Sequence, residues 1–313
     1  MGLLPMDADI LPPSDDRVFK LILTSPESKT GLMKLISAVI GRKVVDVALF
    51  PNELGPGDTK EKAERFDVNC KIDDKSQINL EMQSSRIIED LDGKHRNLKG
   101  KSIYYLTDLH SSQPAKGLQR YDELARTYQI TFCSYTVFPE SPDYVNSFSL
   151  RHDKTGEQLS DAISVTFVEL SKLSEIVKKP VGEMTDLEKW SVFFRYAPDP
   201  KYRETVNNVI ASEEVLTVAG ELLMSISQNE AERAIFRSRR KFQTDYGSDM
   251  ATARDNGRAE GLVEGRKEGR KEGRKEGRQE GKLEIARMML SAGESIEKIM
   301  TYTGLTKQEI TQL

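Results

Sequence analysis

The sequence contains few of the residues that build disulfide frameworks or zinc sites. Its 313 residues include two cysteines, Cys70 and Cys133, and three histidines. Both cysteines lie in stretches where apolar residues alternate, which is typical of small core side chains. The histidines are scattered without metal-ligand spacing, and we interpret them as surface or helix-packing residues. Because so few cysteines suit a reducing compartment, we expect a cytoplasmic protein.

Long apolar runs are also missing from the chain. No stretch approaches the roughly eighteen consecutive apolar residues of a transmembrane helix, so we expect no membrane partner. The N-terminal stretch lacks the basic and apolar regions of a secretory signal. Apolar residues make up 37% of the sequence, charged residues make up 31%, and mean hydropathy is −0.53. Since globular domains are usually more apolar, part of the chain is expected to lie outside a core.

A global excess of positive charge is absent as well. The net charge is −4, which by itself gives no indication of nucleic acid. The distribution is uneven, because residues 258–282 contain nine Lys or Arg and six Glu, a local charge of +3. The remaining residues therefore carry −7. An acidic body and a basic tail segment are expected.

The order of the expected elements divides the chain into five segments. Helices and strands come first and helices alone follow, which predicts an α/β or α+β body with a helical extension. The expected segments are a flexible arm over 1–13, the mixed core over 14–183, a helical extension over 184–255, a Gly-rich repeat helix or linker over 256–282, and a small helical module over 283–313.

Residues 65–83, "RFDVNCKIDDKSQINLEMQ", are typical of a β-hairpin. Apolar and polar side chains alternate on both halves, so each strand has one apolar and one polar face. A three-residue turn pairs Cys70 with Ile78 and keeps the two apolar faces together. The same register places Asp67 directly opposite Glu81.

The two acids at this position need an explanation. Directly opposed residues have Cβ atoms roughly 4.5–5.5 Å apart, and like charges there are destabilising. A hard divalent cation bound by Asp67 and Glu81 would remove the repulsion, and the neighbouring Asn69, Asn79 and Gln83 suit an oxygen-rich site. The alternative is a solvent-exposed polar sheet face on which two acids lie near each other by chance.

Several blocks of the sequence resemble the PD-(D/E)XK nuclease superfamily, and more closely its Rpn family of recombination-promoting, transposase-like nucleases. The block "DDRVFKLIL" resembles the N-terminal helix of the family, with Asp16 at the family's spacing from Phe19 and Lys20. The hairpin matches the pattern D-x(13)-E-x-Q, and "KSIYYLTDLHSSQPAKGLQRYDEL" resembles the helix and turn that follow it. A Gly-rich tetrad tail with a terminal helical piece is also common in this family.

The resemblance implies a fold, a cofactor and a set of site residues. The expected fold is α/β, a restriction-endonuclease-like mixed β-sheet core flanked by helices, with a C-terminal helical extension. The cofactor is Mg²⁺, with Mn²⁺ as an alternative, bound by Asp67 and Glu81. Gln83 and Asp16 complete the implied catalytic set. Gln83 occupies the place of the superfamily's Lys, and it can orient water but supplies no charge.

The implied reaction is metal-dependent endonucleolytic hydrolysis of DNA. Lys101, Arg96 and Lys99 are the expected contacts to the DNA backbone; Lys101 stands where the family usually has Arg, so a charge is kept without the bidentate fork. The basic cluster around Arg96 and Lys99 can equally be a solvated helix start. The alternative is that the protein keeps the nuclease fold but has lost catalysis. It would then act as a DNA-binding or self-assembling regulatory protein.

The tail has two features of interest. Glu-Gly recurs every four residues, six times from Glu260 to Gly281. Each Gly destabilises an isolated helix by about 1 kcal/mol relative to Ala. Each pair of Glu and Lys at i,i+3 stabilises the helix by a few tenths of a kcal/mol. We expect a self-association or spacer helix here, with a flexible charged linker or direct DNA contact as alternatives.

The final "SIEKIMTYTGLTKQEITQL" resembles half of a helix-turn-helix with "TGLT" as the turn. Because it has few basic residues, we expect a packing module, and a homo-oligomer formed through the repeat and these terminal helices.

Overall fold

The computed structural model describes residues 3–50, 68–84, 96–113 and 120–313. The chain forms two compact units, Met1–Lys241 and Phe242–Leu313. Each unit is described by itself. Within the described ranges, no helix has the length and apolar character needed to cross a membrane.

The first unit contains six strands and most of the helices. The strands are β1 (Val47–Leu49), β2 (Val68–Ile72), β3 (Gln77–Gln83), β4 (Thr127–Cys133), β5 (Val145–Phe148) and β6 (Ile163–Glu169). The helices are α1 (Asp16–Thr24), α2 (Lys29–Ile40), α4 (Arg96–Ser111), α5 (Asp186–Tyr196), α6 (Arg203–Ala211) and α7 (Glu214–Gln228), followed by the start of α8 (Glu230–Ser291). Short 3₁₀ turns lie at Pro26–Ser28, Tyr121–Glu123, Leu170–Lys172, Ile176–Lys178, Val181–Glu183 and Pro200–Tyr202.

The strands form one mixed sheet in the order β1-β2-β3-β4-β6-β5. Strands β1, β2 and β3 pair antiparallel, β3, β4 and β6 run parallel, and β5 is antiparallel to β6. Helix α4 joins β3 to β4, so that the parallel pair has the crossover connection that its geometry requires. This arrangement confirms the expected α/β fold with a mixed β-sheet core.

The β2–β3 hairpin has the register that the alternation predicted. Cys70 pairs with Ile78 and Val68 pairs with Leu80. The connection turns through Lys75, whose φ of 69° is left-handed, as expected for the third position of a three-residue hairpin loop. Asp67, whose position opposite Glu81 was also predicted, lies outside the described residues.

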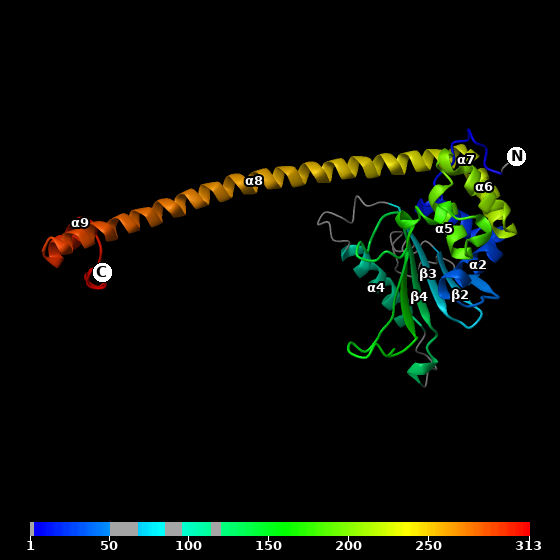
Figure 1. Ribbon diagram of the computed structural model, residues 1–313, viewed down its shortest axis with the longest axis horizontal. Helices are drawn as coiled ribbons and strands as arrows, with labels where there is room; N and C mark the ends of the chain where they lie inside the picture. The colour runs from blue at the N-terminus through cyan, green and yellow to red at the C-terminus, as the bar shows by residue number, and fades with distance from the viewer. Residues whose placement is uncertain (1–2, 51–67, 85–95, 114–119) are drawn as a thin grey trace, which may run out of the picture. The chain divides into compact units, whose positions relative to one another are not determined.

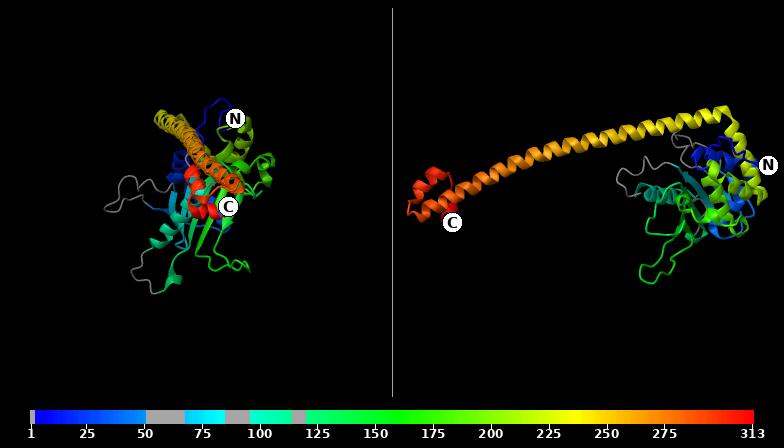
Figure 2. Two further views of the ribbon diagram at one scale, coloured as in Figure 1. Left: turned by 90° about the vertical axis from the view of Figure 1, so that its left-hand side faces the viewer. Right: turned by 45° about the horizontal axis from the view of Figure 1, so that its top comes forward.

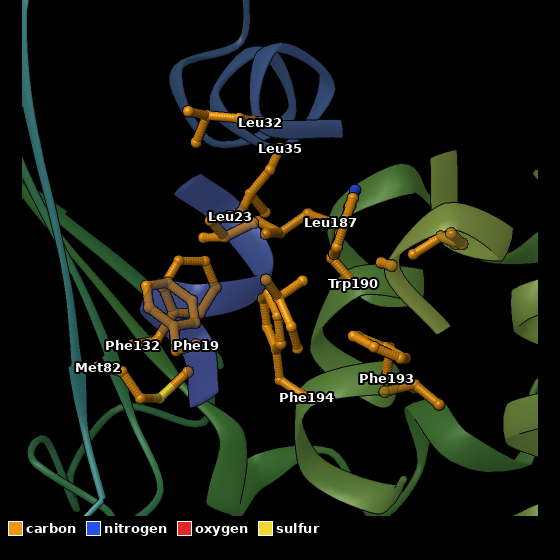
Figure 3. Close-up of a cluster of buried hydrophobic side chains, with 14 of the residues drawn as sticks. Phe19, Leu23, Leu32, Leu35, Met82, Phe132, Leu187, Trp190, Phe193 and Phe194 are labelled. Atoms are coloured by element: carbon orange, nitrogen blue, oxygen red, sulfur yellow. The ribbon is translucent and has the colours of Figure 1, made fainter. Parts of the chain in front are cut away.

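One face of the sheet carries the main hydrophobic core. Helices α1, α2 and α5 pack against it, while α4 lies on the other side of the sheet (Figure 1). Phe19 of α1 contacts Phe132 of β4 and Phe194 of α5, with ring centroids 5.8 and 5.2 Å apart (Figure 3). Trp190 is also buried in this cluster, with its ring 5.6 Å from that of Phe194. These aromatic contacts fix α1 and α5 on the sheet.

The opposite face is covered by α4. Leu98 and Leu106 of this helix are buried with Val165 and Phe167 of β6. The contacts are apolar over β6 and become polar toward β3, where Asn79 is fully buried. The polar half of this face is where the predicted site residues gather.

The N-terminal residues differ from their prediction as a flexible arm. Leu4, Ile10 and Leu11 are each at most 5% exposed and belong to the main core. The Leu4 backbone N–H donates to Asn207 Oδ1 at 2.9 Å, and the Asn207 amide donates back to the Leu4 carbonyl at 2.9 Å. Burial of these apolar side chains against α6 and α7 orders residues that three prolines made look irregular in the sequence.

The second unit consists of the remainder of α8, α9 (Ile296–Thr303) and α10 (Lys307–Thr311). The tetrad repeat is helical throughout, as part of α8. Helices α9 and α10 fold back beside the last turns of α8 (Figure 2). They bury a small cluster made of Ala286, Ile299, Leu305 and Ile310. The predicted turn between them is present: Gly304 ends α9 with φ 68°, and Thr306 caps α10.

Candidate functional site

Strand β3 directs Glu81 into the space between the sheet and α4. Side chains alternate along the strand, so Ile78, Leu80 and Met82 enter the main core while Asn79 and Glu81 face α4. Glu81 is 1% exposed, and β3 is an inner strand of the sheet, between β2 and β4. The polar face is therefore not the solvent-exposed surface that the sequence left open as an alternative.

A set of amides holds the carboxylate of Glu81. Gln83 Nε2 donates to Glu81 Oε2 at 3.2 Å, and Asn79 Nδ2 donates to Glu81 Oε1 at a longer 3.4 Å. Asn79 Nδ2 also donates to Gln129 Oε1 at 2.8 Å, and Gln129 Nε2 donates to Thr131 Oγ1 at 3.2 Å. Because β3 and β4 pair Asn79 with Gln129 and Glu81 with Thr131, the strand register itself builds this polar row.

Helix α4 supplies a cation to the same carboxylate. Lys101 Nζ lies 3.2 Å from Glu81 Oε2, and its side chain is 31% exposed whereas that of Glu81 is 2% exposed. The ammonium group also lies 5.2 Å from the ring centroid of Tyr105, one helical turn further along α4. Ser102, the next residue, is buried with its hydroxyl 3.4 Å from that of Thr131. Lys101 thus reaches the site from a helix whose position is fixed by buried neighbours.

Burial and charge act on Glu81 in opposite directions. Burial raises the pKa of Glu81, whereas the Lys101 ammonium and the hydrogen bonds from Asn79 and Gln83 lower it. The net direction is upward. A buried carboxylate with a raised pKa and a specific cation partner is a common feature of functional sites. A divalent cation in place of a proton would stabilise the ionised form.

The described residues suit a hard divalent cation in kind. Besides the Glu81 carboxylate, the amide oxygens Asn79 Oδ1 and Asn69 Oδ1 are buried and accept no hydrogen bond. These two residues pair across β2 and β3. Carboxylate and amide oxygens are the ligands that Mg²⁺ and Mn²⁺ prefer. Within the described ranges no group of three His, Cys, Asp or Glu comes together, and Asp67, the second carboxylate predicted to bind the metal, lies outside them.

The other predicted site residues are Asp16, Lys99 and Arg96. Asp16 begins α1, on the opposite face of the sheet, and its carboxylate pairs with Arg239 of α8. Lys99 Nζ lies 4.4 Å over the ring of Phe138. Arg96 begins α4, and its side chain lies outside the described residues. No described contact joins these three residues to Glu81, and their roles stay predictions.

Sequence reasoning missed the contribution of β4. Gln129 and Thr131 are buried beside Asn79 and Glu81, but the sequence analysis assigned no site residue to this strand. The polar alternation of Gln129 and Thr131 was a visible signal, because two buried polar residues in a central strand need partners on the neighbouring strand.

Comparison with known families adds two matches. The profile described as "PD-(D/E)XK nuclease family transposase" matches residues 13–253, and the profile described as "Rpn/YhgA-like nuclease family, C-terminal HTH domain" matches residues 279–313. Searches of curated proteins and of solved structures give no match. The first profile covers the whole mixed sheet and the polar row around Glu81. The chain therefore belongs to the PD-(D/E)XK nuclease family transposases and ends in a helix-turn-helix domain of the Rpn/YhgA-like type.

Proposed function

We propose that this protein is a metal-dependent endodeoxyribonuclease of the recombination-promoting type. The observation that carries the proposal is the buried Glu81 carboxylate, which lies between Lys101 and Gln83 on a central strand of a nuclease-family sheet. Glu81 and Asp67 would hold Mg²⁺ or Mn²⁺, with Asn79 as a neighbouring oxygen donor. A bound divalent ion supplies Lewis-acid stabilisation of the scissile phosphate and lowers the pKa of an attacking water.

Other side chains of the protein would supply the remaining catalytic and DNA-binding roles. Gln83 can orient a water by hydrogen bonding but carries no charge. Lys101 supplies the positive charge that Gln83 lacks, from α4 instead of from β3, and can stabilise negative charge that develops on the phosphate. The fixed placement of α4 over the sheet makes this charge available without reorganisation. Lys99 and Arg96, on the first turn of α4, are proposed to contact the DNA backbone.

The cleavage of supercoiled plasmid DNA tests this proposal. Wild-type protein is expected to nick or linearise the plasmid with Mg²⁺ or Mn²⁺ and to be inactive with a chelator. Asp67→Asn and Glu81→Gln should each reduce the rate by roughly 100-fold or more, because each removes a proposed metal ligand. Glu213→Gln is a matched control, since Glu213 is an ion-paired carboxylate held by Lys34 and Lys189, on helices that pack against the other face of the sheet.

A catalytically decayed DNA-binding protein is the second candidate. It is favoured by one observation: the Lys101 ammonium already neutralises Glu81, and Gln83 stands where a cation is more often found. If the wild-type protein binds DNA but shows no cleavage with either metal, and Asp67→Asn binds equally well, this function replaces the enzyme.

We propose that DNA is the partner of both the mixed-sheet unit and the C-terminal helical domain. The C-terminal domain matches a helix-turn-helix profile, and its α9–turn–α10 arrangement agrees with that match. We also propose a cytoplasmic location, because Cys70 and Cys133 are buried thiols and because burial raises the pKa of the Cys70 thiol to about 12, which keeps it unreactive.

A further inference from the structure

The tetrad repeat gives α8 four distinct longitudinal rows of side chains in the second unit. Because four residues advance the helix by about 40° beyond one full turn, each residue type of the repeat follows its own slowly winding row. At 100° per residue, the Gly row has a Glu row on one flank and an Arg row on the other, and the Lys row lies on the back. The Gly row comprises Gly257, Gly261, Gly265, Gly269, Gly273, Gly277 and Gly281.

An isolated helix with this pattern is only partly compensated, because Glu and Lys at i,i+3 support it by no more than a few tenths of a kcal/mol per pair. Residues four apart are neighbours on a helix surface, and in the repeat they are always alike, as in Glu268 with Glu272 or Arg270 with Arg274. Each such pair is destabilising by a few tenths of a kcal/mol, and each Gly costs about 1 kcal/mol relative to Ala. Among the described residues, no side chain from 257 to 282 forms an ion pair, although all of these positions are described.

The Gly row is open on the outside. A Cβ atom added at any of its seven glycines would meet no atom within 4 Å. The Gly row thus borders space that no described residue fills, between one row of negative charge and one row of positive charge. Such space fits a partner helix whose charges are arranged in the complementary order. The chain itself carries such a helix.

We propose that the Gly row of α8 packs against the Gly row of a second copy of this chain, with the two helices parallel. In a parallel pair related by a two-fold axis along the helices, the Glu row of one copy faces the Arg row of the other on both sides of the contact. In an antiparallel pair, Glu would face Glu and Arg would face Arg. Flanking charges decide helix orientation in coiled coils in the same way.

The winding of the row determines how the helices cross. A repeat longer than 3.6 residues gives a right-handed arrangement, and rows of small residues spaced by four allow close backbone approach at a crossing angle near −40°. Close contact then extends over a few tetrads. It centres on Gly269 and Gly273, since the Glu and Arg rows are both uninterrupted on either side of them.

Charge-row variants of the full chain test the pairing, with sedimentation velocity at about 0.1 M salt as the measurement. The first variant makes the Glu row basic, through Glu268→Lys, Glu272→Lys and Glu276→Lys. The second makes the Arg row acidic, through Arg270→Glu, Arg274→Glu and Arg278→Glu. The control reverses the row on the back of the helix, through Lys267→Glu, Lys271→Glu and Lys275→Glu.

In a dimer of either of the first two variants, side chains of like charge face each other across the contact. The dimer dissociation constant should therefore rise on the order of tenfold or more. An equimolar mixture of the two should restore the dimer, and the control should match wild type. A monomeric wild-type chain, a control that dissociates as readily as the first two variants, or a mixture that stays monomeric would each overturn the proposal.

A spin-label distance tests the orientation. Arg287 is exposed, and the native cysteines are buried, so Arg287→Cys gives a selective label on the full chain. The label lies roughly 24 Å along α8 from the centre of the contact, so a parallel crossing predicts a label separation of roughly 20–30 Å. A separation near 45 Å would show an antiparallel pair and overturn the proposed orientation.

Discussion

The ion pair between Glu81 and Lys101 joins two residues with different exposure. Glu81 is enclosed by β3, β4 and α4, while Lys101 reaches it from the edge of α4 with about a third of its side chain exposed. Removing one partner of such a pair leaves an uncompensated buried charge, which costs more than the pair itself contributes. The pH dependence of this cost follows from the pKa of Glu81.

Lys101→Met should lower the free energy of unfolding by roughly 1–3 kcal/mol at pH 7, a range reduced for the partial exposure of Lys101. Because the folded-state pKa of Glu81 is already raised by burial, loss of the ammonium raises it further. The folded state then binds a proton more tightly than the unfolded state, so stability is lost as pH rises above the unfolded pKa of Glu, about 4.3.

Urea unfolding at pH 7 and at pH 4.5 measures this difference. The destabilisation by Lys101→Met should shrink at the lower pH, and Lys101→Arg should retain most of the stability because it keeps the charge. Adding Glu81→Gln to Lys101→Met should recover much of the loss. A loss that is equal at both pH values would show that Lys101 contributes packing and not charge.

At the scale of elements, backbone conformation accounts for where several helices end. Helix α2 ends at Gly41, which has φ 72° and whose N–H donates to the Ser37 carbonyl. Gly is common at this position after a helix, because it is the residue that adopts the left-handed conformation most easily. No atom lies within 4 Å of a Cβ built at Gly41, so the conformation is its only constraint.

Gly41→Ala should therefore destabilise the protein by about 1 kcal/mol, through the cost of a left-handed Ala. Gly182→Ala is the matched control, since a Cβ there also meets no atom within 4 Å and its backbone is not left-handed. Thermal unfolding of the two variants measures the difference. Equal melting temperatures would contradict the conformational explanation.

The β2–β3 hairpin shows how much of an element can be predicted from sequence. Alternation limited the hairpin to a turn with an odd number of residues or a bulge, because a two- or four-residue turn would have mixed apolar and polar faces. Periodicity predicts less of α4, because the apolar Ile103 is 58% exposed. The helix instead buries Ser102 over the polar row of the sheet, and this depends on what β4 places beneath it. The contact between Lys101 and Glu81 could not be predicted for the same reason.

At the scale of the whole chain, the residues before α1 are part of the first unit's core. Their sequence contains prolines and no helical or strand period, so local patterns gave no sign of their docking. The partners that dock this segment lie on α6 and α7. Asn207 and Ser227 accept hydrogen bonds from the backbone N–H groups of Leu4 and Leu11. Long-range partners of this kind have no local signature.

Leu4→Ala should lower the free energy of unfolding by about 2–4 kcal/mol, because Leu4 is 1% exposed and its truncation leaves a cavity. Met6→Ala is the control, as Met6 is 60% exposed and its loss should change stability by less than about 0.5 kcal/mol. Urea denaturation of both variants measures the difference. If Leu4→Ala unfolds like Met6→Ala, the N-terminal segment does not stabilise the core in solution.

Manganese binding tests the central claim, a metal centre built on Glu81 and Asp67, most directly. Titration of Mn²⁺ into the full chain, followed by the EPR signal of the free ion, should show binding by the wild type. Asp67→Asn and Glu81→Gln should each weaken that binding by about tenfold or more, and Glu213→Gln should leave it unchanged. Equal Mn²⁺ binding by the wild type and both site variants, or no binding by any of them, would contradict the account.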